Sequence, residues 1–229
     1  MRQIIAIGGG GFGRVIKDLK IENYIKSQCK SDSPKICFIP TATGDDNQYI
    51  ENFYKAFDSI GCKTSHIDFF KRTINLVEHI KKQDIIFVGG GNTKSMLAVW
   101  KDWGLDVLLE EAYKNGVIMC GVSAGAICWF NKGITDSWAD DLAIMDCLGF
   151  VDGVCCPHYD EEPARRPYVK DKLDRADFDE CIGVEGNAAL HIINEESYKS
   201  VNFGDNKNSY RISLKDNIVH EDPFESIKI

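Results

Sequence analysis

Short apolar runs alternate with longer segments of mixed polarity through the first half of the chain. The mixed segments have helical spacing, as in 49–60, where Ile50, Phe53 and Phe57 fall on one face. Apolar strands separated by helices predict an α/β fold with a parallel sheet covered on both faces. The predicted strands are 4–7, 35–40, 64–69, 84–88 and 117–120, and the predicted helices are 15–28, 49–60, 93–103 and 105–115.

The last third of the chain has a different pattern, in which strand-like runs are joined by short turns. Residues 214–218 have the composition of a hairpin turn. The sequence therefore predicts antiparallel strands in the C-terminal part, and because no linker or repeat interrupts it, one domain over 1–229. The strand-like runs are 151–157, 183–193, 200–203, 210–214 and 217–221.

Composition narrows the possible partners and the compartment. The 229 residues are 44% hydrophobic and 27% charged, with a net charge of -8 and no long Lys/Arg run. This balance argues against nucleic acid or an anionic membrane as a partner. The nine cysteines are scattered without a Cys-x-x-Cys pair, and residues 1–5 lead straight into a strand without a signal peptide. We expect reduced thiols and a cytoplasmic protein rather than a disulfide framework or a zinc site.

The segment 117–126 carries the strongest chemical signal. An apolar run leads into Gly121-Val122-Ser123-Ala124-Gly125, and a helix-prone segment follows. Gly-x-Ser-x-Gly between a strand and a helix is typical of a nucleophile elbow, which lifts one side chain off the end of a strand. Ser123 is therefore the candidate nucleophile, and an ordinary strand-to-helix loop is the simpler alternative.

Two other strands end in glycine-rich turns. Residues 8–13 match the Gly-x-Gly-x-x-Gly spacing of dinucleotide-binding proteins, but the acid that should close the second strand is missing, because Asp32 precedes that strand. A tight turn without a nicotinamide or flavin is the better prediction. The turn 89–91 offers backbone N–H groups suited to an oxyanion, and Asn92 after it is a candidate helix cap.

A serine nucleophile needs a neighbouring base. Among five histidines, His158 stands where the apolar run 154–157 stops, at the functional end of a sheet, and it is the candidate base. His191 lies inside an apolar run and is expected to be a packed core histidine. His66 and His79 also look structural, and His220 falls in the polar hairpin.

Several acids are candidates for the carboxylate that should orient the base. Asp136 falls between the nucleophile and the base, and Glu185 ends a later strand-like run; Asp140, Asp141 and Asp160 are near in sequence as well. Arg165 and Arg166 follow His158. Each is either a clamp for a substrate carboxylate or one half of an ion pair with Asp160, Glu161 or Glu162.

Four motifs in order, 88–93, 121–126, 156–158 and 183–187, resemble the peptidase E family of serine peptidases, relatives of cyanophycinase. The resemblance covers nearly the whole chain. It implies a flavodoxin-like three-layer sandwich similar to the class I glutamine amidotransferases. It also implies Ser123 as the nucleophile, where amidotransferases carry cysteine, and His158 as the base.

The same resemblance implies further roles. Backbone N–H groups of Ala124 and Gly90 would bind the oxyanion, without metal or cofactor. Family members hydrolyse dipeptides with an N-terminal aspartate, whose carboxylate is read by an arginine after the histidine; Arg166 is the nearest match and Arg165 the next. Asn92 is a further candidate substrate contact. Asp136 matches the position of the acid, although some relatives use glutamate.

Other functions stay open beside a serine dipeptidase acting on short peptides. A glutamine amidotransferase-like amidase is disfavoured because Cys120 lies three residues before the elbow serine. An α/β-hydrolase esterase is disfavoured because 71 residues follow His158. A catalytically silent relative that binds a small acidic ligand is the non-enzyme alternative. The sequence does not decide the oligomeric state.

Overall fold

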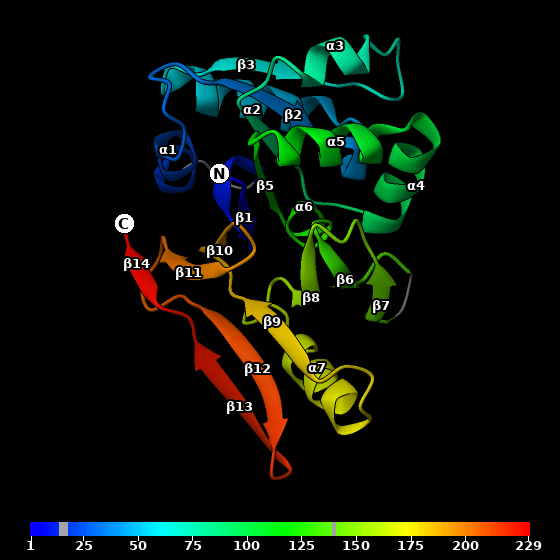
Figure 1. Cartoon of the computed structure of the whole chain (residues 1–229), viewed down its shortest axis with the longest axis vertical. Helices are drawn as coiled ribbons and strands as arrows, with labels where there is room; N and C mark the ends of the chain where they lie inside the picture. The colour runs from blue at the N-terminus through cyan, green and yellow to red at the C-terminus, as the bar shows by residue number, and fades with distance from the viewer. Residues whose placement is uncertain (14–17, 139–140) are drawn as a thin grey trace.

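Two β-sheets organise the computed structural model, which describes residues 1–13, 18–138 and 141–229 (Figure 1). The larger sheet has eight strands in the order β14-β11-β10-β1-β5-β4-β2-β3. Its strands are β1 (Gln3–Ile7), β2 (Lys35–Ile39), β3 (Lys63–His66), β4 (Ile85–Val88), β5 (Ile118–Val122), β10 (Ala188–Ile193), β11 (Ser197–Asn202) and β14 (Ser226–Lys228).

The centre of this sheet is parallel, as the apolar runs predict. Strands β1, β5, β4, β2 and β3 pair in parallel, whereas β10 pairs antiparallel with both β1 and β11. Successive side chains of β1 enter two different cores: Ile4 and Ala6 face one, and Ile5 and Ile7 face the other. Burial on both faces explains why the strands are continuously apolar rather than alternating. The predicted α/β class with a mostly parallel central sheet is confirmed.

Helices cover both faces of the larger sheet and make it the middle of three layers. One face packs against α1 (Lys20–Ser27) and α2 (Asn47–Ser59). The other face packs against α3 (Leu76–Ile80), α4 (Thr93–Trp103), α5 (Leu105–Lys114) and α6 (Ala124–Ile127). Short 3-10 turns η1 (Gly11–Gly13) and η2 (Thr41–Thr43) follow β1 and β2.

A second sheet of six strands lies in the lower half of Figure 1, in the order β13-β12-β9-β8-β6-β7. Helix α7 (Arg165–Asp174) packs Val169 and Leu173 into a core shared with this sheet. Its strands are β6 (Phe130–Thr135), β7 (Ala143–Asp146), β8 (Val151–Cys156), β9 (Glu180–Val184), β12 (Ser209–Lys215) and β13 (Ile218–Pro223).

The structure corrects one predicted strand and confirms the hairpin. The single run 183–193 was wrong: it is β9 in one sheet and β10 in the other, separated by the turn 185–187. Asn187 at the end of that turn has a φ of 57°, which no strand continues through. The hairpin turn is present between β12 and β13, where Asp216 and Asn217 both have positive φ. The predicted helix 15–28 is α1, shorter at its start; residues 14–17 lie outside the described chain.

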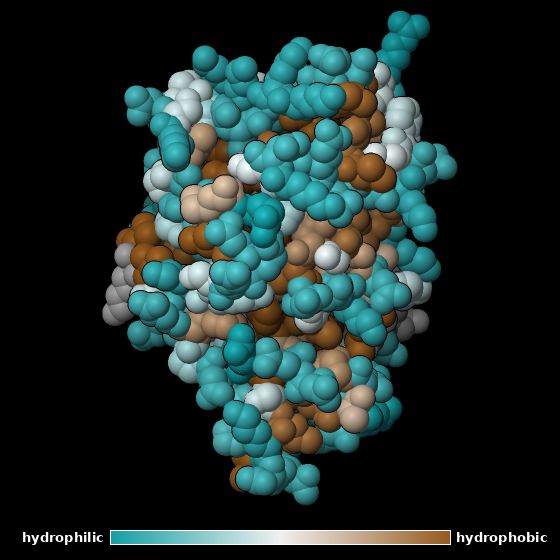
Figure 2. Space-filling model, viewed as in Figure 1, coloured by the Kyte–Doolittle hydropathy of each residue, from teal (hydrophilic) through white to brown (hydrophobic). Residues whose placement is uncertain are grey.

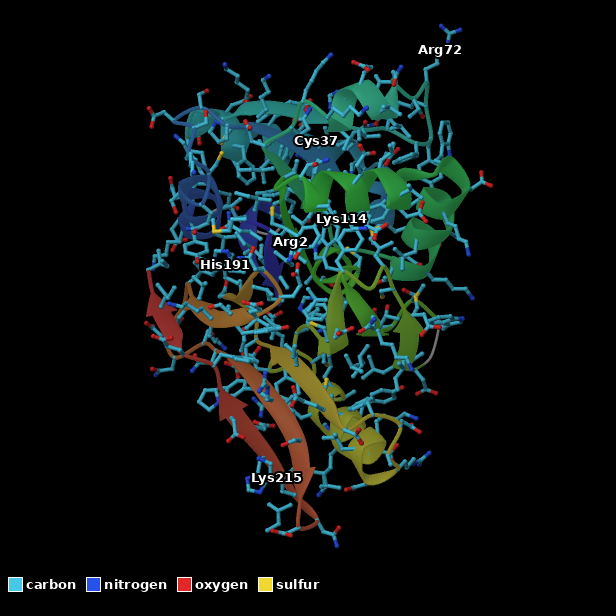
Figure 3. All side chains as sticks on the ribbon, in the orientation of Figure 1. Arg2, Cys37, Arg72, Lys114, His191 and Lys215 are labelled. Atoms are coloured by element: carbon cyan, nitrogen blue, oxygen red, sulfur yellow. The ribbon has the colours of Figure 1, made fainter. Side chains whose placement is uncertain are left out.

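The histidines predicted to be structural are packed as such. His191 on β10 (Figure 3) is buried. Its ring lies 2.7 Å from Tyr24 Oη and 3.1 Å from Gln3 Oε1. His66 Nδ1 lies 2.7 Å from Tyr54 Oη, and His79 Nε2 lies 3.1 Å from Ser65 Oγ. These contacts account for three of the five histidines without any catalytic role.

The molecular surface in the view of Figure 2 is mostly hydrophilic, with scattered hydrophobic patches. Val107 on α5 and Trp103 at the end of α4 are among the large hydrophobic side chains left exposed. Within the described residues, no helix is long and apolar enough to cross a membrane. All nine cysteines are unpaired, and seven of them are buried.

Candidate active site

Ser123 stands on a sharp turn between β5 and α6, as the elbow motif predicts. Its backbone has φ 58° and ψ -111°, a conformation that a non-glycine residue adopts only when its surroundings enforce it. Glycines make the turn possible: a methyl group on Gly121 would lie 2.4 Å from the carbonyl oxygen of Gly125, and one on Gly125 would lie 2.2 Å from that of Val88. Close backbone packing therefore explains both glycines of the motif.

His158 follows the last residues of β8 and faces the serine. Its Nε2 lies 2.9 Å from Ser123 Oγ. The histidine also has a positive φ, 51°, and its backbone N–H donates to the carbonyl oxygen of Gly8 at 3.1 Å. The two residues lie 35 positions apart in the sequence and come from different sheets, and the structure brings them into hydrogen-bonding distance.

The carboxylate beside His158 belongs to Glu161. Its Oε2 lies 2.6 Å from His158 Nδ1, and the Glu161 N–H donates to the His158 carbonyl oxygen at 3.0 Å, which closes a turn between them. Sequence reasoning considered Glu161 only as an ion-pair partner of an arginine. The signal that could have found it is the three-residue spacing from His158, since a turn returns the third residue to the first side chain.

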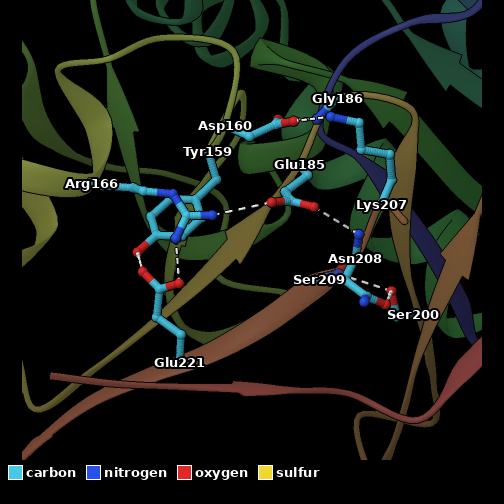
Figure 4. Close-up of polar contacts among 10 residues, drawn as sticks. All are labelled: Tyr159, Asp160, Arg166, Glu185, Gly186, Ser200, Lys207, Asn208, Ser209 and Glu221. Atoms are coloured by element: carbon cyan, nitrogen blue, oxygen red, sulfur yellow. Dashed lines mark hydrogen bonds and ion pairs between the residues drawn. The ribbon is translucent and has the colours of Figure 1, made fainter. Parts of the chain in front are cut away.

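The two acids named from the sequence lie elsewhere. Asp136 is exposed after β6, and its charge acts on Arg165. Glu185 is buried at 6% exposure, accepts the N–H of Asn208 at 2.9 Å and pairs with Arg166 at 3.1 Å (Figure 4). Neither is hydrogen-bonded to His158, so the geometry favours Glu161 for the position next to the base; Asp140 lies outside the described residues.

Both candidate arginines are bound to carboxylates of the chain itself. Arg165 is buried, and it donates to Glu162 Oε2 at 2.6 Å and to the carbonyl oxygen of Ile134 at 3.0 Å. Burial is the largest single effect and opposes its charged form, but the hydrogen bond to Glu162 and the surrounding negative charges together raise the pKa of Arg165.

Arg166 stacks on the ring of Tyr159, 4.3 Å from the centroid, between Glu185 and Glu221 (Figure 4). Burial opposes its charge as well, and the hydrogen bond with Glu221 raises the pKa of Arg166. Arg165 therefore forms the predicted ion pair with Glu162, whereas Arg166 is paired with two acids, Glu185 and Glu221, that the sequence did not suggest as its partners. A role in binding a substrate carboxylate stays a prediction.

A cavity of about 400 Å³ opens beside Ser123 and His158. The described residues that line it are mostly polar or glycine, and neither candidate arginine is among them. Asn92 is absent from the lining as well: it caps α4 by accepting the Ser95 N–H at 2.9 Å and donates to the carbonyl oxygen of Ser137. Besides the serine and histidine, the lining comprises Gly10, Gly13, Thr43, Asp46, Gln48, Tyr49, Asn52, Gly90, Gly91 and Val122.

The glycine turns bring backbone close to the serine. A methyl group on Gly90 would lie 3.2 Å from Ser123 Cβ, and the Gly90 N–H points to Tyr49 Oη at 3.4 Å. Ala124 begins α6, where the first N–H groups have no acceptor inside the helix. The turn after β1 is tight, since a methyl group on Gly8 would lie 2.2 Å from the carbonyl oxygen of Glu185.

Comparison with known proteins places this chain in a family. Residues 4–199 match the family model described as peptidase family S51. The chain is 44% identical over 225 residues to the "Uncharacterized peptidase YgaJ" of Bacillus subtilis (strain 168), covering 98% of this chain and 97% of that protein. It is 32% identical over 116 residues to "Peptidase E" of Salmonella arizonae, covering 49% and 48% of the two chains.

Solved structures agree on the fold. A peptidase from an acI-B1 Actinobacterium superimposes with a TM-score of 0.63 at 17% identity, covering 98% of this chain and 94% of that one. The resemblance to the peptidase E family that the four motifs carry is thereby confirmed. The chain belongs to peptidase family S51.

Proposed function

We propose that this chain is a serine peptidase that hydrolyses short peptides through an acyl-enzyme formed on Ser123. The observation that carries the proposal is the 2.9 Å contact between Ser123 Oγ and His158 Nε2 at the wall of the cavity. This is the distance at which a histidine accepts a hydroxyl proton. Membership in a peptidase family supports the same class of reaction.

In the proposed reaction, Ser123 Oγ attacks the scissile carbonyl carbon while His158 Nε2 takes its proton. The tetrahedral intermediate collapses when His158 returns that proton to the leaving amine, which breaks the C–N bond and leaves an ester on Ser123. A water molecule then attacks the ester with the same histidine as base, releasing the acid product and restoring the hydroxyl. The proton that His158 takes in each half of the cycle is given up again in the same half, and no oxidant or reductant is needed.

We assign the third catalytic position to Glu161 instead of Asp136 or Glu185. A carboxylate on Nδ1 keeps the other ring nitrogen free to accept a proton and stabilises the imidazolium that forms. The 2.6 Å contact from Glu161 Oε2 to His158 Nδ1 supports this role, whereas Asp136 is exposed and Glu185 is bound to Arg166.

The oxyanion would be bound by the N–H groups of Gly90 and Ala124. Gly90 lies against Ser123, and Ala124 opens a helix whose positive end faces the same point. In the free enzyme the Gly90 N–H points to Tyr49 Oη at the long distance of 3.4 Å. A developing alkoxide would be a stronger acceptor for this donor than a phenol oxygen.

The substrate class follows from the size of the cavity and the family. A volume of about 400 Å³ suits a short peptide rather than a folded protein. Dipeptides with an N-terminal aspartate are the finer proposal, with Arg166 as the partner of the side-chain carboxylate. Because Arg166 is paired with Glu185 and Glu221, aspartate would have to replace one of these acids.

The test is hydrolysis of the dipeptides Asp-X, Glu-X, Asn-X and Ala-X by the wild-type chain and by Ser123→Ala. Ser59→Ala, an exposed serine at the end of α2, is the matched control. Cleavage that is lost in Ser123→Ala and kept in Ser59→Ala supports the nucleophile. Restriction to Asp-X supports the arginine contact, and cleavage of the other dipeptides removes the aspartyl preference alone.

Two remaining functions are outcomes of the same experiment. Turnover of amide or ester substrates in place of peptides, still dependent on Ser123, would indicate an amidase or esterase on the same fold. Failure of every substrate together with no labelling of Ser123 by a serine-directed phosphonate would contradict the proposal and leave a silent ligand binder.

A further inference from the structure

The turn 185–187 connects the two sheets and lies against the catalytic histidine. It joins β9 to β10, the Asn187 N–H donates to the Gly9 carbonyl oxygen at 2.9 Å, and the Gly8 N–H donates to the Ala188 carbonyl oxygen at 3.0 Å. His158 in turn donates its own N–H to Gly8. Three chain segments distant in sequence therefore meet behind the base.

The Glu161 carboxylate is enclosed by two glycines of these segments. A methyl group on Gly186 would lie 2.3 Å from Glu161 Cδ. One on Gly9 would lie 2.5 Å from Glu161 Oε2 and 2.9 Å from His158 Nδ1. Backbone from both sheets thus confines the carboxylate where it meets the histidine, and any added side-chain atom would displace it.

Asp160, the neighbour of Glu161, anchors the loop to the same turn. Its Oδ1 accepts the Gly186 N–H at 2.8 Å, and its Oδ2 forms an ion pair with Lys207 (Figure 4). The Asp160 side chain is only 17% exposed. The hydrogen bond with Asp160 raises the pKa of Lys207, and the charge of Glu161 adds to this effect. Lys207 therefore offsets the repulsion between two adjacent carboxylates.

We propose that Gly186 and Asp160 are positioning residues that hold the Glu161 carboxylate on His158 Nδ1, with Lys207 as the counter-charge of Asp160. This inference rests on the proposed function, in which Glu161 orients the base. Neither residue is part of the described cavity lining, and both act through Glu161. Asp160 fixes the loop to the turn, and Gly186 leaves the space that Glu161 fills.

The experiment compares Gly186→Ala, Asp160→Ala and Asp160→Asn with the wild type. Gly133→Ala is the matched control, since its added methyl group would meet Ile127 Cβ at 2.7 Å and so crowds a core without touching Glu161. Two quantities are measured on the folded protein. The first is kcat and KM for the best dipeptide of the panel. The second is the low-field proton NMR signal of the His158 imidazole N–H, assigned by its loss in His158→Gln.

We expect Gly186→Ala and Asp160→Ala to lower kcat about 100-fold with KM changed less than about threefold, because the acid is displaced and the cavity is intact. The His158 signal should move upfield or disappear in both. Asp160→Asn keeps an acceptor for the Gly186 N–H and loses only the ion pair, so it should lower kcat by less than about fivefold and keep the signal. Gly133→Ala should keep wild-type kcat and KM and the His158 signal, although its unfolding midpoint falls.

Wild-type kcat together with an unchanged His158 signal in Asp160→Ala would overturn the inference, even where Gly186→Ala fails to fold. A higher KM with unchanged kcat would overturn it too, because a positioning residue acts on the chemical step and therefore on kcat. A different result would contradict the proposed function itself, in which Glu161 orients the base. In that case the His158 signal of Glu161→Gln would be the same as in the wild type.

Discussion

The elbow that carries Ser123 and the loop that carries His158 and Glu161 form one site by opposite means. The elbow is built mostly by its own motif: Gly121 packs against the carbonyl oxygen of Gly125, and Gly125 packs against that of Val88 on the neighbouring strand β4. The loop depends on partners far away in the chain: His158 bonds to Gly8, Tyr159 to Val184, and Asp160 to Gly186. A short motif packed on one neighbouring strand therefore fixes the nucleophile, whereas contacts with several distant segments fix its base and acid.

This difference predicts how each half responds to change. In the elbow, activity should fall only when Ser123 itself is replaced or when an added side chain causes a steric clash at the turn. The loop should lose activity through residues that never meet the substrate, since its geometry is held from outside. Substitutions in each half test this difference.

Removal of the nucleophile should have the largest effect. Ser123→Ala is expected to lower kcat/KM about 10⁴-fold or more, and His158→Gln about as much, because the two act as one unit. The double variant should be no worse than either single one. Steady-state kinetics on the best dipeptide check this, and losses that multiply in the double variant would contradict a shared step.

Removal of the acid should come second and distinguishes the three carboxylates. Glu161→Gln is expected to lower kcat about 10²–10⁴-fold, since the amide no longer stabilises the imidazolium. Asp136→Asn, the isosteric change at the position named from the sequence, should leave kcat within about threefold. Kinetics on both variants and on Glu185→Gln decide the assignment, and a larger loss in Asp136→Asn would refute it.

The buried histidine of β10 should give a smaller effect, on stability rather than catalysis. Burial, with the charge of Lys199 adding to it, lowers the pKa of His191 from 6.5 to about 4. The unfolded chain therefore binds this proton first as the pH falls. Stability contributed by the neutral ring is complete above about pH 6.5 and is lost toward pH 4, by about 3 kcal/mol in all.

Urea unfolding at pH 7 and pH 4.5 tests this for the wild type and His191→Gln. The variant should be less stable at pH 7, because Tyr24 and Gln3 lose their partner. It should nevertheless lose less free energy of unfolding on acidification than the wild type. Equal losses in the two proteins would show that His191 does not titrate as its burial requires.

A crowding substitution in the elbow should have the smallest effect. Gly125→Ala places a methyl group 2.2 Å from the Val88 carbonyl oxygen and is expected to cost about 1–3 kcal/mol of unfolding free energy. Because β4 must move to make room, kcat should fall as well. Thermal unfolding beside activity checks this, and a wild-type melting temperature would contradict the close packing read from the backbone.

The elements of the larger sheet could be predicted because their signals are local. Continuous apolar strands and the helical spacing of 93–103 reproduce β4, β5 and α4 closely. The division of 183–193 between two sheets could not be predicted, since both halves are equally apolar and only the positive φ of Asn187 separates them. Strands β6 and β7 were missed for a related reason: they mix polar and apolar residues without a clear period.

For the site, the serine and the histidine could be identified as candidates from their sequence context. Ser123 sits in a motif whose glycines have a steric purpose, and His158 ends an apolar strand. Which carboxylate faces the base, and which acids the arginines pair with, depends on contacts between distant segments of the folded chain. Glu161, Asp136 and Glu185 are chemically equivalent acids in a sequence. A hydrogen bond depends on a distance of a few ångströms, which only the folded backbone sets.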